Sequence, residues 1–221
     1  VALIVMSVVC AAGSGLSAAG AQAGQSRPAL TGADIDAIAR LLQIEDTRQF
    51  DAATLASLLA SPHAEVRRRA VITVGRVVHD QGLGLLDQRR TDSVPDIVAT
   101  VAFAMGQLKN PAAVPWLTET MGRWQHNADA AFEAARALGK IRSPEAWTAL
   151  AAFARTAPDT PAARVVIGEA LLSLGRFTTR EDLAPILRWT TNDDVEVRWR
   201  ATWALFRPRN PAALPHLMRL T

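Results

Sequence analysis

The sequence lacks tyrosine, contains a single cysteine, Cys10, and uses lysine only at Lys109 and Lys140. Because Cys10 lies in a segment that we expect to be removed, disulfides, cysteine-ligated metals and thiol catalysis are excluded from the mature chain. With so little lysine, the basic residues are almost all arginine, and the net charge is only +3. The missing tyrosine also argues against tetratricopeptide repeats, whose pattern requires it.

Acidic and basic residues alternate along the chain, as in residues 65–67 (Glu-Val-Arg) and residues 193–198 (Asp-Asp-Val-Glu-Val-Arg). This alternation is typical of a solvated helical surface. Nucleic-acid-binding proteins instead gather positive charge on one face. We therefore expect no nucleic-acid partner.

Residues 1–23 have the features of a secretion signal. Residues 1–12 are an uncharged apolar run, residues 13–20 are small and polar, and residues 21–23 (Ala-Gln-Ala) fit a small-x-small cleavage site. The apolar run is too short for a transmembrane helix, which needs about 20 strongly apolar residues. We expect cleavage after residue 23, a periplasmic or secreted bacterial protein, and no stable membrane anchor after cleavage.

The rest of the chain repeats with spacings of 31, 33, 36 and 31 residues. Each repeat has a marker position, usually a glycine between an apolar and a polar residue. The markers are Gly75, Gly106, Gly139, Gly175 and Phe206. Apolar residues eight and eleven positions after each marker, the last being Leu214 and Leu217, predict an amphipathic helix A. Apolar and small residues before each marker predict a second helix, B.

Capping residues and prolines indicate where these helices begin. Asn110, Ser143 and Asn210 each precede a proline and are expected to cap a helix A. Ser61 and Thr160 precede a proline in the same way and are expected to cap two B helices. The fourth helix A has a start resembling a capping box at residues 179–182.

Residues 110–117 and 210–217 are identical at six of eight positions, three repeats apart. The second copy opens a sixth helix A, whose helix B does not follow before Thr221. We therefore expect the natural protein to continue beyond Thr221 with a further helix B.

A helix is also predicted ahead of the array, because Thr31 and Asp34 form a helix start. Its expected apolar face is formed by Ile35, Ile38, Leu41 and Leu42. Residues 24–50 are therefore expected to be a lead-in and an N-terminal capping helix for an array that spans residues 51–221.

The pattern resembles the short HEAT-like repeats of the phycocyanobilin-lyase type. The resemblance rests on Glu-Val-Arg at residues 65–67 and 196–198, on the Leu-Gly-Lys/Arg markers, and on the repeated Asn-Pro-Ala-Ala. It implies an all-α, right-handed α-solenoid of about five helix pairs plus a sixth, incomplete repeat. The layout also resembles the N-terminal half of bacterial exported cyclophilin-type peptidyl-prolyl isomerases, which implies a catalytic domain beyond residue 221.

No motif predicts catalysis, a metal or a cofactor, and we expect none in this chain. The histidines have no second histidine or cysteine at ligand spacing; they are His63, His79, His126 and His216. Asp193 and Asp194 stand where a helix B begins, and capping is the favoured interpretation.

Two positions of helix B, three and seven residues before the marker, flank its apolar face by roughly 100°. This flank row includes Phe132 and the residues most expected to bind a partner, which are Arg68, Phe103, Arg136, Trp199 and Trp203. The row either lines a concave groove for a peptide or packs against the next repeat, and we favour packing. The resulting hypothesis is an exported scaffold that binds a protein or peptide. The alternative is the N-terminal part of a peptidyl-prolyl isomerase.

Overall fold

The computed structural model describes residues 28–178 and 182–220, and all regular structure in these ranges is helical. The expected signal sequence and most of the helix start expected at residues 179–182 fall outside the described residues. The helix A elements are α2 (Ala52–Leu59), α4 (Gly82–Asp87), α6 (Val114–Gly122), α8 (Pro144–Thr156), α10 (Ala184–Leu187) and α12 (Leu214–Leu217). The helix B elements are α3 (Ala64–Val77), α5 (Pro95–Leu108), α7 (Ala128–Ile141), α9 (Pro161–Leu174) and α11 (Val195–Phe206). Single 3₁₀ turns, η1 (Pro111–Ala113) and η2 (Pro211–Ala213), precede α6 and α12.

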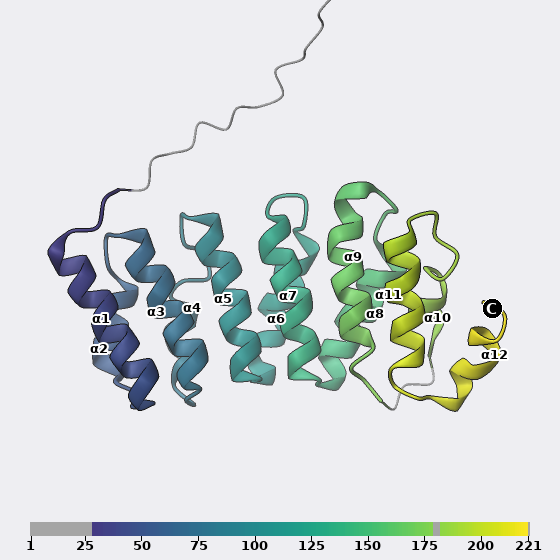
Figure 1. Cartoon of the computed structure of the whole chain (residues 1–221), viewed down its shortest axis with the longest axis horizontal. Coiled ribbons are helices and arrows are strands. Elements are labelled where there is room, and N and C mark those ends of the chain that lie inside the picture. Colours follow the sequence, from purple (N-terminus) through teal and green to yellow (C-terminus); the bar gives the residue numbers. More distant parts are fainter. Residues whose placement is uncertain (1–27, 179–181, 221) are drawn as a thin grey trace, which may run out of the picture.

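These elements form an α-solenoid in which the B helices stand side by side in one layer and the A helices form a second layer behind them (Figure 1). Five A/B pairs are followed by η2 and α12, which confirms the predicted all-α repeat architecture. The B helices are uniform, with 12 or 14 residues each, whereas the A helices range from 4 to 13. Neighbouring B helices therefore provide the regular part of the array.

The marker glycines let neighbouring B helices approach closely. A Cβ added to Gly75 would lie 2.8 Å from the Cα of Ala104, and one added to Gly106 would lie 2.8 Å from the Cα of Ala137. Each contacted residue stands two positions before the next marker, and Gly139 and Gly175 repeat the relationship with Ser173 and Ala204. Only glycine fits between backbones at these distances without a shift of the helices.

Phe206 stands at the fifth marker position, and its side chain is 64% exposed. Within the described residues no B helix follows α11, so the bulky ring meets no neighbouring backbone there. Leu214, on the expected apolar face of the sixth helix A, is also exposed. It is exposed because no helix B in the described part of the chain covers it.

The helix α1 (Gly32–Thr47) lies against α3 at the start of the B layer (Figure 1). Its capping box at Thr31 and Asp34 forms as predicted. The predicted apolar face was partly wrong, because Ile35 and Leu42 are exposed and Ile44 is buried instead. α1 packs mainly on α3, so only a narrow stripe of its surface is buried.

The predicted helix starts at Asn110, Ser143, Thr160, Asn210 and Asp194 are confirmed, because each side chain accepts a hydrogen bond from a backbone N–H in the first turn. The start at Ser61 was wrong. α3 begins at Ala64, and the ring of His63 accepts the capping bond from the Glu65 N–H at 3.2 Å. Ser61 instead accepts from the His63 N–H in the preceding turn.

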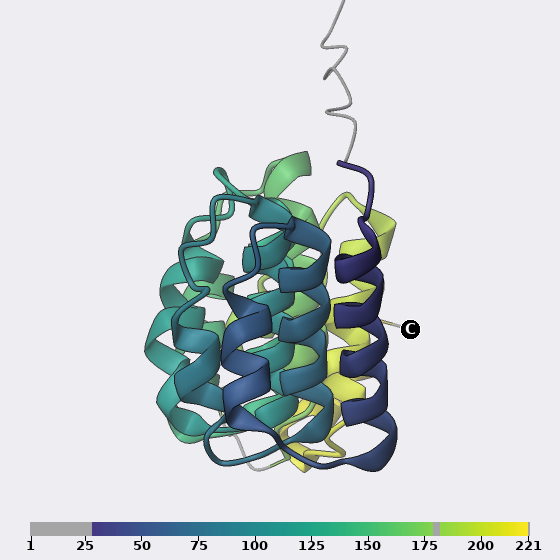
Figure 2. The same cartoon turned by 90° about the vertical axis from the view of Figure 1, so that its left-hand side faces the viewer.

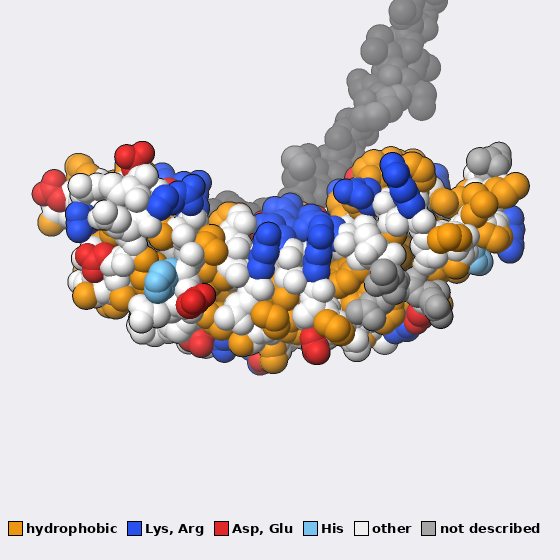
Figure 3. All heavy atoms as spheres, turned by 90° about the horizontal axis from the view of Figure 1, so that it is seen from below, with side chains coloured by type: hydrophobic (Ala, Val, Ile, Leu, Met, Phe, Trp, Pro, Cys, Tyr) orange, Lys and Arg blue, Asp and Glu red, His pale blue; other side chains and the backbone are white. Residues whose placement is uncertain are grey.

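The array curves, and its B layer lies on the inner side. Viewed from one end, the middle repeats lie displaced toward the A side relative to both ends (Figure 2). Viewed from below, the molecule is a shallow crescent whose two ends rise on the B side (Figure 3). The curvature places the side chains that project from the B helices on a concave face.

Candidate functional site

The concave face contains two hollows, each spanning three neighbouring B helices. The first hollow, of about 470 Å³, lies across α3, α5 and α7 and is lined by Ile72, Phe103, Asp96, Asp129 and Glu133 among others. The second hollow, of about 250 Å³, lies across α7, α9 and α11. Phe132 on α7 lines both hollows. Together they extend across all five B helices, and we call this surface the groove.

The two edges of this groove carry opposite charges. Ten residues before the marker, four of the five B helices carry a carboxylate; these are Glu65, Asp96, Asp129 and Glu196. One residue after the marker, four carry a base; these are Arg76, Lys140, Arg176 and Arg207. Carboxylates at helix starts and bases at helix ends are favoured by the helix dipole. Figure 3 shows lysine and arginine side chains gathered along the concave edge where the B helices end.

Arg68 and Arg136 of the flank row bind carboxylates, and each reaches the next B helix. Arg68 makes two hydrogen bonds to Glu65 and lies 4.0 Å from Asp96 on α5. Arg136 bonds Glu133 at 3.0 Å and Glu169 on α9 at 3.2 Å. These contacts agree with the interpretation that the row packs between repeats.

The aromatic members of the row differ in exposure. The Lys140 ammonium lies 4.9 Å from the centre of the half-buried Phe103 ring, and the Arg136 guanidinium lies 4.6 Å from that of Phe132. Trp203 is half-buried and lies close to Gly175, whereas Trp199 is 54% exposed. Trp199 is therefore the member that packs least.

Around Glu133, in the middle of the B layer, several acidic and basic side chains are partly or fully buried. Burial raises the pKa of the Glu133 carboxyl above its usual range, although Arg136 and Lys140 act in the opposite direction. Burial likewise lowers the pKa of the Lys140 ammonium. Glu169 is buried and accepts a hydrogen bond from Arg136. A charged ligand bound here would shift the pKa values of these groups further, because a nearby charge favours or disfavours their ionised forms.

Sequence reasoning missed Asp96, Asp129 and Glu133 as groove residues. None of the three is singled out in the sequence analysis. The available signal was register, because Asp96 and Asp129 recur at the same distance from successive markers. Register alone does not show that adjacent B helices place these carboxylates around one hollow.

Within residues 28–178 and 182–220, no group of three or more histidine, cysteine, aspartate or glutamate side chains could hold a metal. His63 caps α3, and His79 stacks on Phe50 with ring centres 4.1 Å apart. None of the helices in these ranges is long and apolar enough to cross a membrane.

Comparison with known proteins gives one family. A family model of HEAT repeats matches residues 52–124 and 82–168. Human deoxyhypusine hydroxylase in complex with glycerol is similar in structure, with a TM-score of 0.46 and 17% identity, over 85% of this chain and 69% of that one. No curated protein matches the sequence. The resemblance to exported isomerases is not tested and stays a prediction.

The HEAT matches join into one continuous stretch, residues 52–168, which is more than half of the chain. That stretch coincides with stacked A/B helix pairs whose B helices meet at the marker glycines. This chain belongs to the HEAT-repeat family.

Proposed function

We propose that this protein is an exported scaffold that binds a protein segment or peptide in the groove on its concave face. The observation that carries this proposal is a row of aromatic side chains on the B helices. Phe103 is on α5, Phe132 is on α7, and Trp199 stands on α11 at the same distance from its marker as Phe132. Phe103 and Phe132 line a hollow, and Trp199 is exposed. Aromatic residues are the types that most often anchor interfaces.

The groove also suits an extended segment better than a compact ligand. The hollows are open to solvent and share Phe132 as a wall, and together they extend over α3, α5, α7, α9 and α11. The concave surface of a stacked repeat array is an extended binding surface by construction. An extended chain can contact successive B helices, since these stand about 8–10 Å apart in packed arrays.

The test is selection of binders from a displayed library of random 12-residue peptides, followed by affinity measurement with synthetic copies. Phe132→Ala should weaken binding at least tenfold, because Phe132 contributes to both hollows. Phe153→Ala is the matched control: Phe153 is a half-buried ring in α8 of the A layer, and its loss should lower stability without affecting peptide affinity. Equal affinity for the two variants would overturn the proposal.

A further inference from the structure

The first hollow has an excess of negative charge. Three carboxylates line it, those of Asp96, Asp129 and Glu133, against one guanidinium, that of Arg76. The Asp96 side chain is 60% exposed and approaches Arg68 only to 4.0 Å. Asp129 is exposed, and within the described residues its carboxylate has no ion-pair partner. Both carboxylates are therefore available to a ligand.

The bases around the hollow already have partners. Arg76 lies 2.6 Å from the carboxylate of Glu45 on α1. Arg68 is held by both oxygens of Glu65. The Lys140 ammonium lies over the ring of Phe103. Asp96 therefore has only the 4.0 Å contact from Arg68, and Asp129 has no ion pair within the described residues.

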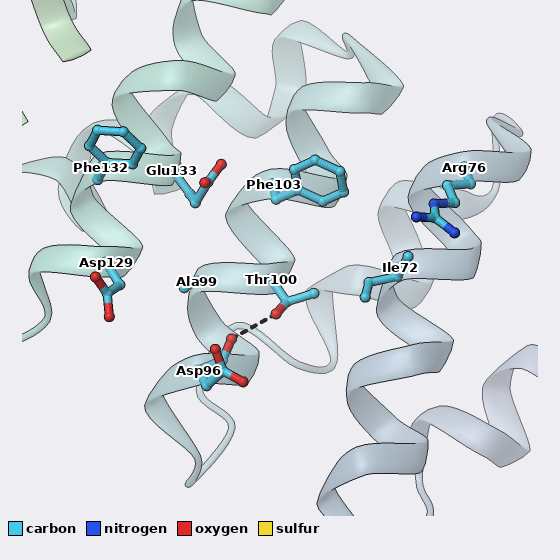
Figure 4. Close-up of a pocket in the computed structure, with 9 residues that line it drawn as sticks. All are labelled: Ile72, Arg76, Asp96, Ala99, Thr100, Phe103, Asp129, Phe132 and Glu133. Atoms are coloured by element: carbon cyan, nitrogen blue, oxygen red, sulfur yellow. Dashed lines mark hydrogen bonds between the residues drawn. The ribbon is translucent and has the colours of Figure 1, made fainter. Parts of the chain in front are cut away.

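Glu133 provides a second, independent observation. One of its oxygens accepts from Arg136 at 3.0 Å. The other, Oε2, is buried and has no hydrogen-bond partner among the described residues. Figure 4 shows this side chain directed from α7 toward α5, in the space between the rings of Phe132 and Phe103. A buried carboxylate oxygen without a donor is costly, and a cation bound nearby at Asp96 and Asp129 would stabilise the Glu133 carboxylate through its charge.

The walls of the hollow suit the rest of a long basic side chain. Phe103, Phe132, Ile72 and Ala99 offer apolar surface beside the carboxylates. Lysine and arginine bury their methylene stems on such surface while the charged group reaches acceptors. The volume of about 470 Å³ is within the range of about 300–1,000 Å³ for ligand pockets.

We propose that the first hollow selects a lysine or arginine side chain of the peptide bound along the groove, with Asp96 and Asp129 as its acceptors and the carboxylate of Glu133 beside them. This assignment rests on the proposed function and adds the chemistry of the partner to it. The bound segment is basic at this position and lies across α3, α5 and α7. Salt weakens the contact, since two of the carboxylates are exposed.

The test uses peptides selected from the same 12-residue library and their synthetic twins in which each arginine or lysine is replaced by glutamine. Selected peptides should share a basic residue, and its glutamine twin should bind at least tenfold more weakly. Asp96→Asn combined with Asp129→Asn should weaken the basic peptide by a similar factor and leave its twin unchanged. Asp80→Asn, in the exposed loop between α3 and α4, is the control for charge and should have no effect.

A charge reversal keeps the test valid if the asparagine variants lose stability. The Asp129→Lys variant should prefer a third synthetic peptide, in which glutamate replaces the basic residue. It should bind this peptide more tightly than it binds the basic peptide. If peptides bind and Phe132→Ala weakens them, but basic and glutamine twins bind equally, this inference is overturned and the scaffold proposal stands. If no peptide binds the concave face, both are overturned.

Discussion

The guanidinium of Arg67 in α3 is bound by both oxygens of Asp92, in the segment that leads into α5, and the Nε–Oδ2 and Nη2–Oδ1 distances are both 2.9 Å. The two side chains are only 11% and 2% exposed. Nη1 of Arg67 also donates to the carbonyls of Ser61 and Pro62. A single side chain therefore fixes the start of one helix B to the segment before the next.

Asp92→Asn should lower the free energy of unfolding by about 3–5 kcal/mol, because it leaves the largely buried Arg67 without its counter-charge. Urea denaturation of the two proteins measures the difference. Asp87→Asn is the matched control, since Asp87 pairs with Arg90 in a more exposed ion pair. The control should change stability by less than about 1 kcal/mol. Equal losses in the two variants would contradict the role given to Asp92.

The same pair predicts a pH dependence. Burial acts to raise the pKa of Asp92, but hydrogen bonds from Arg67 and the Val94 N–H, with the charges of Arg67 and Arg89, hold it below its usual range. The folded state therefore favours the ionised carboxylate. The resulting stability is present above the unfolded-state pKa of about 3.9 and is lost as the pH falls through the lower folded-state value. Acidification below about pH 4 should destabilise the wild type more than Asp92→Asn.

Gly106→Ala should destabilise the protein by about 1–3 kcal/mol, because the added methyl would press on the backbone of Ala137 and push α5 and α7 apart. Thermal unfolding measures the effect. Gly84→Ala in α4 is the control, since a Cβ there meets no atom within 4 Å, and it should be neutral or stabilising. A neutral Gly106→Ala would refute the explanation of the markers.

Trp199→Ala and Trp203→Ala should differ in stability although both remove an indole from α11. Trp199 is 54% exposed, so its loss should change the unfolding free energy by less than about 1 kcal/mol. Trp203 is half-buried against the backbone near Gly175, so its loss should cost about 2 kcal/mol or more. A large loss for Trp199→Ala would favour the packing interpretation of the whole flank row.

Export predicts a defined mature N-terminus. Expression of the sequence behind an initiating methionine in a bacterial host should give a periplasmic protein that begins at Gly24, because residues 21–23 form the cleavage site. Intact-mass measurement of the purified protein decides the position. Ala23→Pro should block processing at that site and serves as the control. A mature protein that retains residues 1–23 would contradict the prediction of a signal sequence.

The sequence by itself determined the repeat, the helix pairs and most of the helix starts. These features depend on local chemistry: an asparagine or threonine side chain caps its own first turn, and apolar spacing places residues on one helix face. Asn110, Asn210 and Thr160 therefore behave as predicted. Ser61 does not, because His63 lies nearer to the first turn and takes the cap.

The tertiary structure alone decided which side chains meet across repeats. Arg67 and Asp92 are 25 residues apart, and nothing in their local sequence links them. The markers were recognisable as glycines, but their reason, contact with the backbone two residues before the next marker, exists only once the B helices stack. Likewise, Asp96 and Asp129 are two unrelated carboxylates in the sequence. Only the stacking of α5 and α7 places them around one hollow. Contacts between repeats depend on the distance between helices, and that distance is set by packing.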